Sequence, residues 1–386
     1  MRILHISSAR ALGGGERHLA DLVNALANRG HDVHVALAPR SPLREELSAL
    51  PERNLVALPL RNALDVGSAH ALARLVRRHD VEIVHAHMAR DYPLAAYAAR
   101  RNAQARLVIT RHVLFPLSRL HTWTLSSVAR VVAVSHAVAR ALHGQRIFAA
   151  EKISVIPNGI DTGRFDPAAR GFDRNSFRRN LKIAPGRLLV GTVGEINRLK
   201  GQEEFLRAAS LLAARLPRAD FVIAGEDFSR TGEHRARIVK LVGELGLEGR
   251  VHLTGWLEDV APLLCALDLF VSASRTESFG LAIVEAMASG LAVIATATEG
   301  AREIVEDGAT GMLVPVGDLE ALAEAIARLL EDEQARERMG QRARVAARER
   351  FSLERMVEAT ESIYRDALES RAESRARREK SRLLLL

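Results

Sequence analysis

Short apolar runs alternate with longer amphipathic runs along most of this chain, and this alternation constrains the fold more than any other feature. In the first half, apolar runs of strand length occur at residues 2–7, 32–38, 81–86 and 106–110, and stretches with helical periodicity separate them. Repeated strand–helix units predict an α/β fold with a parallel, doubly wound sheet that has helices on both faces. Ligands of such sheets bind at the carboxyl ends of the strands.

The alternation breaks once and then resumes, which predicts two domains. The segment 157–167, PNGIDTGRFDP, is rich in Pro, Gly, Asn and Asp, as interdomain linkers are. We therefore expect two Rossmann-like domains, residues 1–165 and 166–351, with a ligand cleft between them. A C-terminal helix at about 352–370 is expected to pack back on the first domain. The basic tail 371–386 is expected to be disordered.

Composition excludes several classes of protein and predicts where this one is located. The single cysteine, Cys265, excludes an internal disulfide and a thiolate zinc site, and no run approaches the length of a membrane span. These features predict a cytoplasmic protein. Residues 1–160 hold 21 Lys and Arg against 11 Asp and Glu, so we expect peripheral contact with the anionic inner face of a membrane. Aromatic residues make up only 4% and no nucleic-acid motif is present, so nucleic acid is not an expected partner.

Residues 276–286, TESFGLAIVEA, predict an anion site. They follow an apolar run at 267–272 and read as a turn that leads into a helix beginning near Gly280. Unpaired backbone amides and the helix dipole attract anions at such a terminus. The amides concerned are those of Phe279, Gly280 and Leu281. The carboxylates of Glu277 and Glu285 suit sugar or ribose hydroxyls; the alternative is that they are a helix cap and a solvated surface residue.

Two further loops carry groups suited to phosphate. In GEINRLKG (194–201), Arg198 and Lys200 lie between a predicted strand and a predicted helix, where they suit a pyrophosphate or are simply exposed. The run Gly13, Gly14 and Gly15 follows the first strand and allows close approach of a ligand, unless it is only a tight turn. It is not a dinucleotide fingerprint, because His18 stands where the third glycine belongs.

Polar residues also end the predicted strands of the first half. His85 and His87 share a strand face and could bind a metal ion, but no third ligand is evident, so no metal is predicted. His112 directly follows a strand. The segment 112–124 mixes apolar, aromatic and basic residues, and a helix is predicted at 117–129. It is either an amphipathic element that touches a membrane or an ordinary core-facing helix.

Taken together, these motifs resemble those of the GT-B-fold retaining glycosyltransferases of family 4, also called glycosyl transferases group 1. The resemblance runs from GGGE at 13–16 to Phe351 and Tyr364. It includes five motifs: the Glu-x7-Glu signature, the interdomain marker VIPNGID, the Arg/Lys loop GEINRLKG, the segment GARE at 300–303 and the segment DGATGMLVP at 307–315. Five motifs in the family's order are specific, although each alone is weak.

The resemblance implies an enzyme of the hexosyltransferase type. It would move a sugar, without a metal or other cofactor, from a UDP-, GDP- or ADP-sugar to a hydroxyl of a glycan or glycolipid acceptor, as in lipopolysaccharide or exopolysaccharide synthesis. Glu277 and His112 would act at the donor sugar, and Glu285 would bind the ribose. The implied diphosphate-binding residues are Arg198, Lys200, Phe279, Gly280, Leu281, Gly13, Gly14 and Gly15. The first domain would bind the acceptor and the second the nucleotide sugar.

Two departures from the family pattern keep alternatives open. Glu195 stands where the family has an arginine, and Glu299 and Arg302 replace a glycine and a proline. The alternatives are a nucleotide-sugar epimerase or soluble-sugar synthase on the same fold, and a non-catalytic nucleotide-sugar or glycan-binding protein.

Overall fold

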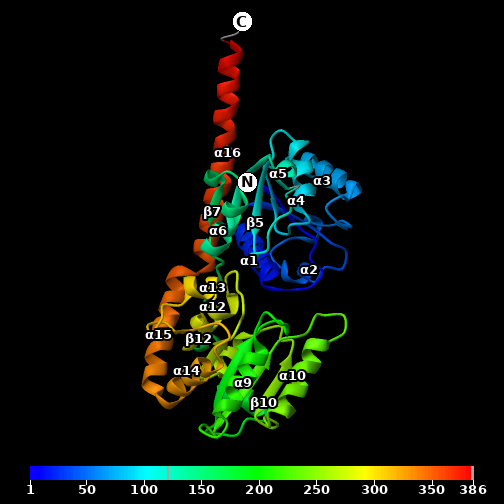
Figure 1. The fold of residues 1–386 in the computed structure, drawn as a ribbon. Helices are drawn as coiled ribbons and strands as arrows, with labels where there is room; N and C mark the ends of the chain where they lie inside the picture. Colours follow the sequence, from blue (N-terminus) through cyan, green and yellow to red (C-terminus); the bar gives the residue numbers. More distant parts are fainter. Residues whose placement is uncertain (120, 384–386) are drawn as a thin grey trace. The chain divides into compact units, whose positions relative to one another are not determined.

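The computed structural model describes residues 1–119 and 121–383 and divides into two compact units (Figure 1). Unit 1 comprises Met1–Gly159 and Leu353–Leu386, and unit 2 comprises Ile160–Ser352. The first boundary therefore lies at 159/160, within the Pro/Gly/Asn-rich segment, and the second at 352/353. Each unit is an α/β layer structure around one parallel sheet, which confirms the predicted fold class.

Unit 1 holds a seven-stranded sheet in the order β3-β2-β1-β4-β5-β6-β7, and every pair of neighbouring strands is parallel. Its elements are β1 (Arg2–Ser7), α1 (Gly14–Asn28), β2 (Asp32–Leu37), α2 (Leu43–Glu46), β3 (Leu55–Ala57), α3 (Val66–Arg78), β4 (Ile83–Ala86), α4 (Tyr92–Arg100), β5 (Arg106–Arg111), α5 (His121–Thr124), β6 (Val128–Ala133), α6 (His136–Gln145), β7 (Ile153–Val155) and α16 (Leu353–Leu383), with 3-10 turns at Glu52–Asn54 and Ala150–Lys152. From β1 to β3, successive strands are added toward one edge of the sheet, and from β4 to β7 toward the other, so the order of strands reverses between β1 and β4. This is the topological switch point, where doubly wound sheets bind ligands.

Unit 2 holds a six-stranded parallel sheet in the order β10-β9-β8-β11-β12-β13. Its elements are α7 (Pro167–Arg170), α8 (Arg174–Asn180), β8 (Leu188–Val193), α9 (Gln202–Leu212), β9 (Ala219–Ala224), α10 (Glu233–Glu244), β10 (Val251–Gly255), α11 (Ala261–Ala266), β11 (Leu269–Ser272), α12 (Leu281–Ala288), β12 (Val293–Thr296), α13 (Glu299–Ile304), β13 (Met312–Val314), α14 (Leu319–Glu331) and α15 (Glu333–Arg350). Its switch point lies between β8 and β11. Continuous apolar strands, buried on both faces, form the core, as is typical of parallel sheets.

Helix α16 belongs to unit 1, although it follows unit 2 in the chain. It packs on α1, β5 and β6. Its Tyr364 is fully buried, and the Tyr364 hydroxyl lies 2.6 Å from Nδ1 of His85. Glu361 pairs with Arg29 and His31 of the first segment at 3.1 and 2.8 Å. The last helix thus contributes both a core residue and ion pairs to the first unit.

The sequence-based expectations differ from the structure at one predicted helix. The predicted helix 117–129 is wrong: only the four-residue α5 forms there, and β6 already begins at Val128. Ser126 and Ser127 follow α5, where serine disfavours continuation of a helix, and Val128 and Ala129 are buried in the sheet. The backbone of α16 is helical as far as Leu383, residues 384–386 lie outside the described part, and disorder of the tail 371–386 stays a prediction. Alanine, arginine and glutamate, which fill this tail, favour a helix.

No helix among the described residues has the length and apolar character needed to cross a membrane.

Candidate functional site

In unit 2, the loop after β8 and the turn after β11 lie against each other at the switch point. Gly201 ends the first loop with φ of 69°, and a Cβ at Gly201 would lie 1.9 Å from the carbonyl oxygen of Ala273. The amide of Arg275 donates to the carbonyl oxygen of Leu199 at 2.8 Å. Backbone contact therefore fixes loop 194–201 beside turn 273–280.

This contact brings Lys200 and Glu277 together. The Lys200 ammonium donates to Oε1 of Glu277 at 2.7 Å. The same oxygen accepts a hydrogen bond of 2.9 Å from the Ser274 hydroxyl, and Thr296 of β12 donates to the Ser274 carbonyl oxygen. The side chain of Glu277 is only 12% exposed, so its orientation is set from several sides.

The N-terminus of α12 opens beside this pair. Gly280 caps the helix with φ of 121°, a conformation that favours glycine. Phe279 is buried against Phe351, with ring centroids 5.7 Å apart. Within the described part of the chain, the amides of Phe279, Gly280 and Leu281 have no hydrogen-bond acceptor. An anion fits such a terminus, and an ammonium group is adjacent.

Gly300 holds the turn from the other side. Its amide donates to the Glu277 carbonyl oxygen at 3.1 Å, and a Cβ here would lie 2.4 Å from the carbonyl oxygen of Phe279. Glu299 and Arg302, the residues that depart from the family pattern, are exposed on either side of Gly300 on α13. The departures therefore leave the close packing of this turn intact.

The remaining predicted residues of unit 2 lie on α12 and on loop 194–201, the two segments that also carry the groups described above. Glu285 is half-buried, four residues into α12 from its first residue. Arg198 is exposed on loop 194–201 and has no ion-pair partner among the described residues. Glu195 is exposed, and its carbonyl oxygen accepts from Gln202 at 2.9 Å. Arg198 is thus an exposed cation without an ion-pair partner in the described structure, on the loop that also carries Lys200.

Two exposed aromatic residues at the carboxyl edge of the same sheet were missed by the sequence analysis. Phe228 follows β9 and Trp256 follows β10; their rings meet edge to face at 5.7 Å and are 47% and 40% exposed. The carbonyl oxygen of Glu226, two residues before Phe228, accepts from the amide of Ile196 in loop 194–201. Their position after strands, at the edge where ligands gather, was the available signal.

In unit 1, the glycine run and His112 meet at the switch point. Gly13 precedes α1, and its amide donates to Oε2 of Glu16 at 3.0 Å. A Cβ at Gly15 would lie 3.6 Å from the His112 ring. Gly14 is exposed beside them as the first residue of α1. The structure therefore brings together the residues of unit 1 that were predicted separately.

His112 is one of five histidines that form a cluster, whose members are His5 of β1, His18 of α1, His85 and His87 of β4 and its end, and His112 after β5. Burial lowers the pKa of all five, to about 3 for His5 and about 4 for His18, and like charge between the rings adds to the effect for His85 and His87. The imidazoles are therefore neutral at neutral pH. The ring of neutral His112 can donate one hydrogen bond from one nitrogen and accept one at the other.

Two triads in this cluster bring ring nitrogens within 4.8 Å of one another, a spacing that a metal ion could bridge. In the triad of His5, His85 and His87, both nitrogens of His85 already bond, to Tyr364 at 2.6 Å and Thr110 at 2.7 Å. The triad of His18, His87 and His112 differs, because each member has a buried ring nitrogen without a partner. The sequence analysis did not find this third ligand, since His18 comes from a helix far from the strand.

Two family models match the chain, and together they span most of it. Glycosyltransferase Family 4 matches residues 12–164, and Glycosyl transferases group 1 matches residues 173–346. The first region lies largely in unit 1, since only its last five residues belong to unit 2, and the second lies entirely in unit 2.

Relatives in sequence and in structure agree with the two family models. The chain is 27% identical to the N-acetyl-alpha-D-glucosaminyl L-malate synthase of Bacillus anthracis, over 93% of this chain and 95% of that protein. It is 31% identical to the lipopolysaccharide core biosynthesis mannosyltransferase LpcC of Rhizobium leguminosarum bv. viciae, over 70% of this chain and 78% of that protein. Among solved structures, Anabaena HepE in complex with UDP and glucose matches with a TM-score of 0.81 and 25% identity, over 94% of this chain and 98% of that one.

Proposed function

Because the chain belongs to glycosyltransferase family 4 and is a glycosyltransferase of the GT-B fold, we propose that it moves a sugar from a nucleotide-sugar donor to a hydroxyl group of a surface glycan or glycolipid. The mannosyltransferase of lipopolysaccharide core synthesis among its relatives supports this acceptor class. The UDP and glucose bound to HepE make UDP-sugars the first donors to test.

The observation that carries the proposal is the Lys200–Glu277 pair beside the open N-terminus of α12. In the proposed role, Lys200, Arg198 and the amides of residues 279–281 bind the donor diphosphate. A departing diphosphate gains negative charge, so fixed amide dipoles and cations stabilise the transition state more than the ground state. Glu285, one turn into the helix, would bind the ribose hydroxyls.

Glu277 is proposed to contact the donor sugar once the diphosphate engages Lys200. The carboxylate would then stabilise positive charge that develops on the sugar ring, which resembles an oxocarbenium ion at the transition state. For unit 1, we propose that neutral His112 hydrogen-bonds the reacting sugar and that Gly13, Gly14 and Gly15 let the backbone approach the diphosphate. Retention of anomeric configuration and independence from metals are part of this proposal.

We further propose peripheral attachment to an anionic membrane at the inner face of the cytoplasmic membrane. Phe115 and Trp123, on the segment around α5, are 64% and 83% exposed, and Arg119 lies between them in the chain. Exposed aromatic side chains with neighbouring basic residues are typical of interfacial membrane contacts. Phe115→Ser with Trp123→Ser should abolish sedimentation with phosphatidylglycerol vesicles, and unchanged sedimentation would contradict this attachment.

The test of the proposed function is a thermal-shift panel with UDP, GDP, ADP and their common sugars, run with EDTA. A ligand at one hundred times its Kd stabilises the folded state by about 2.7 kcal/mol, so one nucleotide should raise the melting temperature selectively. A follow-up assay without acceptor separates transfer from epimerisation, because an epimerase converts the donor alone. No shift with any nucleotide would overturn the donor assignment.

A further inference from the structure

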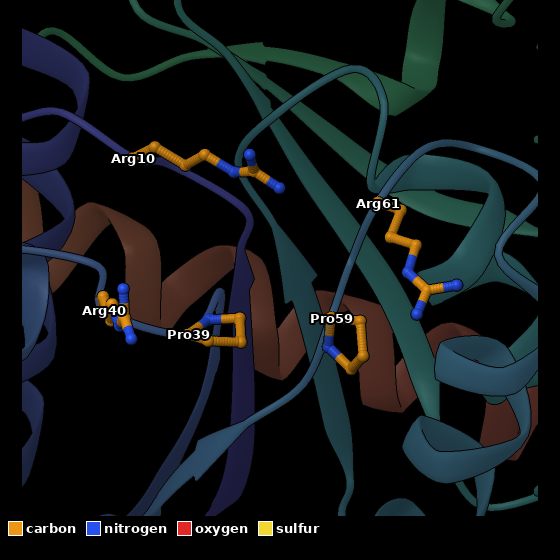
Figure 2. Close-up of a pocket in the computed structure, with 5 residues that line it drawn as sticks. All are labelled: Arg10, Pro39, Arg40, Pro59 and Arg61. Atoms are coloured by element: carbon orange, nitrogen blue, oxygen red, sulfur yellow. The ribbon is translucent and has the colours of Figure 1, made fainter.

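Unit 1 has a pocket of about 560 Å³ that neither the signature turn of unit 2 nor the histidine cluster uses. The described residues that line it are Arg10, Pro39, Arg40, Pro59 and Arg61 (Figure 2). Arg10 comes from the loop after β1, Arg40 follows β2 and Arg61 follows β3. The pocket therefore lies at the carboxyl edge of the sheet, and its lining consists of three arginines and two prolines.

The three arginine side chains lack carboxylate partners, in contrast to others of unit 1. Arg2 and Arg29, for example, pair with glutamates. Arg10, Arg40 and Arg61 are exposed, and none of them forms a side-chain ion pair within the described ranges. In Figure 2, Pro39 and Pro59 lie between Arg40 and Arg61, and the guanidinium of Arg10 extends into the space above the prolines.

The Asp65 carboxylate, which contacts the backbone of Arg61, already has several hydrogen-bond partners. Asp65 caps α3, where it accepts from the amide of Ser68 at 3.0 Å and from the Ser68 hydroxyl at 2.9 Å. It also accepts from the backbone amide of Arg61 at 3.1 Å, which fixes the main chain at the pocket. Amide hydrogen bonds from Ser68 and Arg61, and more weakly the charge of Arg61, lower the pKa of Asp65, but no side-chain hydrogen bond or ion pair joins the Arg61 guanidinium to this carboxylate in the described part of the chain.

The backbone on both sides of the pocket is held in an unusual conformation. The Ser41 amide donates to the Ala38 carbonyl oxygen at 3.1 Å, which closes a turn with Pro39 second and Arg40 third. Arg40 has φ of 59°, at a position where glycine or asparagine is usual. After β3, Pro59 is likewise followed by a residue with positive φ, Leu60 at 42°. Such strain is costly and recurs at ligand sites.

We infer that this pocket binds a negatively charged group of the acceptor, a phosphate or a carboxylate. The inference rests on the proposed function, in which unit 1 receives the acceptor. Guanidinium groups present planar pairs of N–H donors that match the oxygens of either anion, and that of Arg10 extends into the space above the prolines, which lie between Arg40 and Arg61. The volume is in the range of pockets that hold small ligands.

The experiment is a calorimetric titration of the full chain at saturating UDP, which blocks the proposed diphosphate site. The probes are glucose 6-phosphate and glucuronate, with glucose as the neutral reference and dihexanoyl phosphatidate as a lipid-borne phosphate. The variants are the triple change R10Q/R40Q/R61Q and, as a matched control, Arg78→Gln, which removes an exposed arginine of α3 outside the pocket.

We expect at least one anionic probe to bind about tenfold or more tightly than glucose, and the triple variant to lose this preference. Arg78→Gln should retain it. Preference for the soluble probes would assign the anion to a soluble acid or phosphate, and preference for the phosphatidate to a lipid acceptor. Equal binding of the anions and glucose, or equal loss in the Arg78→Gln control, would overturn the inference.

The design separates failure of this inference from failure of the proposed function. If the wild type does not bind UDP, the donor assignment fails, and the titration with anions is then read on its own. If UDP binds equally to the wild type and the triple variant while the anions do not bind either protein, only the pocket assignment fails. A thermal melt of the triple variant checks folding, which three exposed side chains should not disturb.

Discussion

The ammonium nitrogen of Lys200 lies 2.7 Å from Oε1 of Glu277, although 77 positions of sequence separate the two residues. The lysine charge is balanced by a carboxylate that is largely shielded from solvent. A diphosphate that binds to Lys200 must therefore compete with Glu277. This competition leads to opposite expectations for the two residues.

Lys200→Ala should weaken UDP binding by about tenfold or more, because a charge-assisted contact is worth roughly 1.5–3 kcal/mol. Glu277→Gln should strengthen UDP binding by roughly fivefold, since it removes a competing negative charge, and should still lower transfer by at least about 100-fold. Calorimetry with UDP and a transfer assay measure both effects. Glu320→Gln, an exposed carboxylate of α14, is the control. Weaker UDP binding in Glu277→Gln would contradict the competition.

Gly201→Ala should destabilise unit 2 by roughly 2–5 kcal/mol, from left-handed backbone strain together with a steric clash. The clash arises because the new Cβ would lie 1.9 Å from the Ala273 carbonyl oxygen. Gly308 is a matched control: its φ is 74°, but no atom lies within 4 Å of its Cβ position. Gly308→Ala should therefore cost only about 1–2 kcal/mol. Urea unfolding measures the difference, and equal costs would show that loop 194–201 does not depend on this contact.

Trp256→Ala should weaken UDP binding about fivefold or more, because aromatic stacking on a base is worth about 1–3 kcal/mol. The expectation rests on the exposed edge-to-face pair that Trp256 forms with Phe228 at the carboxyl edge of the sheet. Val239→Ala, also an exposed apolar side chain of unit 2, should leave the affinity unchanged. If inorganic pyrophosphate binding falls as much as UDP binding in Trp256→Ala, the ring does not act on the base.

The histidine cluster should make unit 1 sensitive to acid. The folded-state pKa of His5 is lowered to about 3 and that of His18 to about 4, whereas both lie near 6.5 when unfolded. The unfolded chain then binds more protons, so stability is present above pH 6.5 and is lost as the pH falls toward the folded values. Each such histidine contributes up to about 1.4 kcal/mol per pH unit.

Urea unfolding between pH 7 and pH 5 measures this slope. His18→Gln should make it shallower, because one shifted group is removed, whereas His143→Gln on the exposed part of α6 should not. The same slope in His18→Gln and the wild type would contradict the assignment of acid sensitivity to the cluster. Most carboxylates contribute at lower pH, which is why the range ends at pH 5. Burial raises the pKa of Glu16 and Asp91, but both residues are present in the wild type and in both variants, so the comparison of slopes cancels their contribution.

The local parts of the site could be predicted from the sequence, whereas the contacts between them could not. Residues 276–286 form a turn and helix N-terminus because a buried strand, a glycine and an amphipathic run follow one another directly. The Lys200–Glu277 pair instead depends on β8 lying beside β11, a sheet order that periodicity does not reveal. The same holds for His18, which reaches His87 and His112 only because α1 packs at the switch point.

Metal ions should be unnecessary for transfer and inhibitory when they bind. If cations of the protein and helix amides stabilise the departing diphosphate, EDTA should leave the transfer rate unchanged. Zn²⁺, however, favours neutral imidazole nitrogens. Ring nitrogens of His18, His87 and His112 lie within 4.8 Å of one another, and His18 and His87 each have one buried nitrogen without a partner, whereas His112 has two. Added Zn²⁺ should therefore occupy His112 and lower activity, with full recovery on adding EDTA.

His18→Gln keeps a polar side chain but removes one zinc ligand, so it should raise the inhibitory Zn²⁺ concentration about tenfold or more. His143→Gln should leave that concentration unchanged. X-ray absorption at the zinc edge would report nitrogen ligands in the wild type and fewer in His18→Gln, independently of activity. Equal inhibition of wild type and His18→Gln would place the zinc elsewhere, and a loss of activity with EDTA alone would contradict metal-independent transfer.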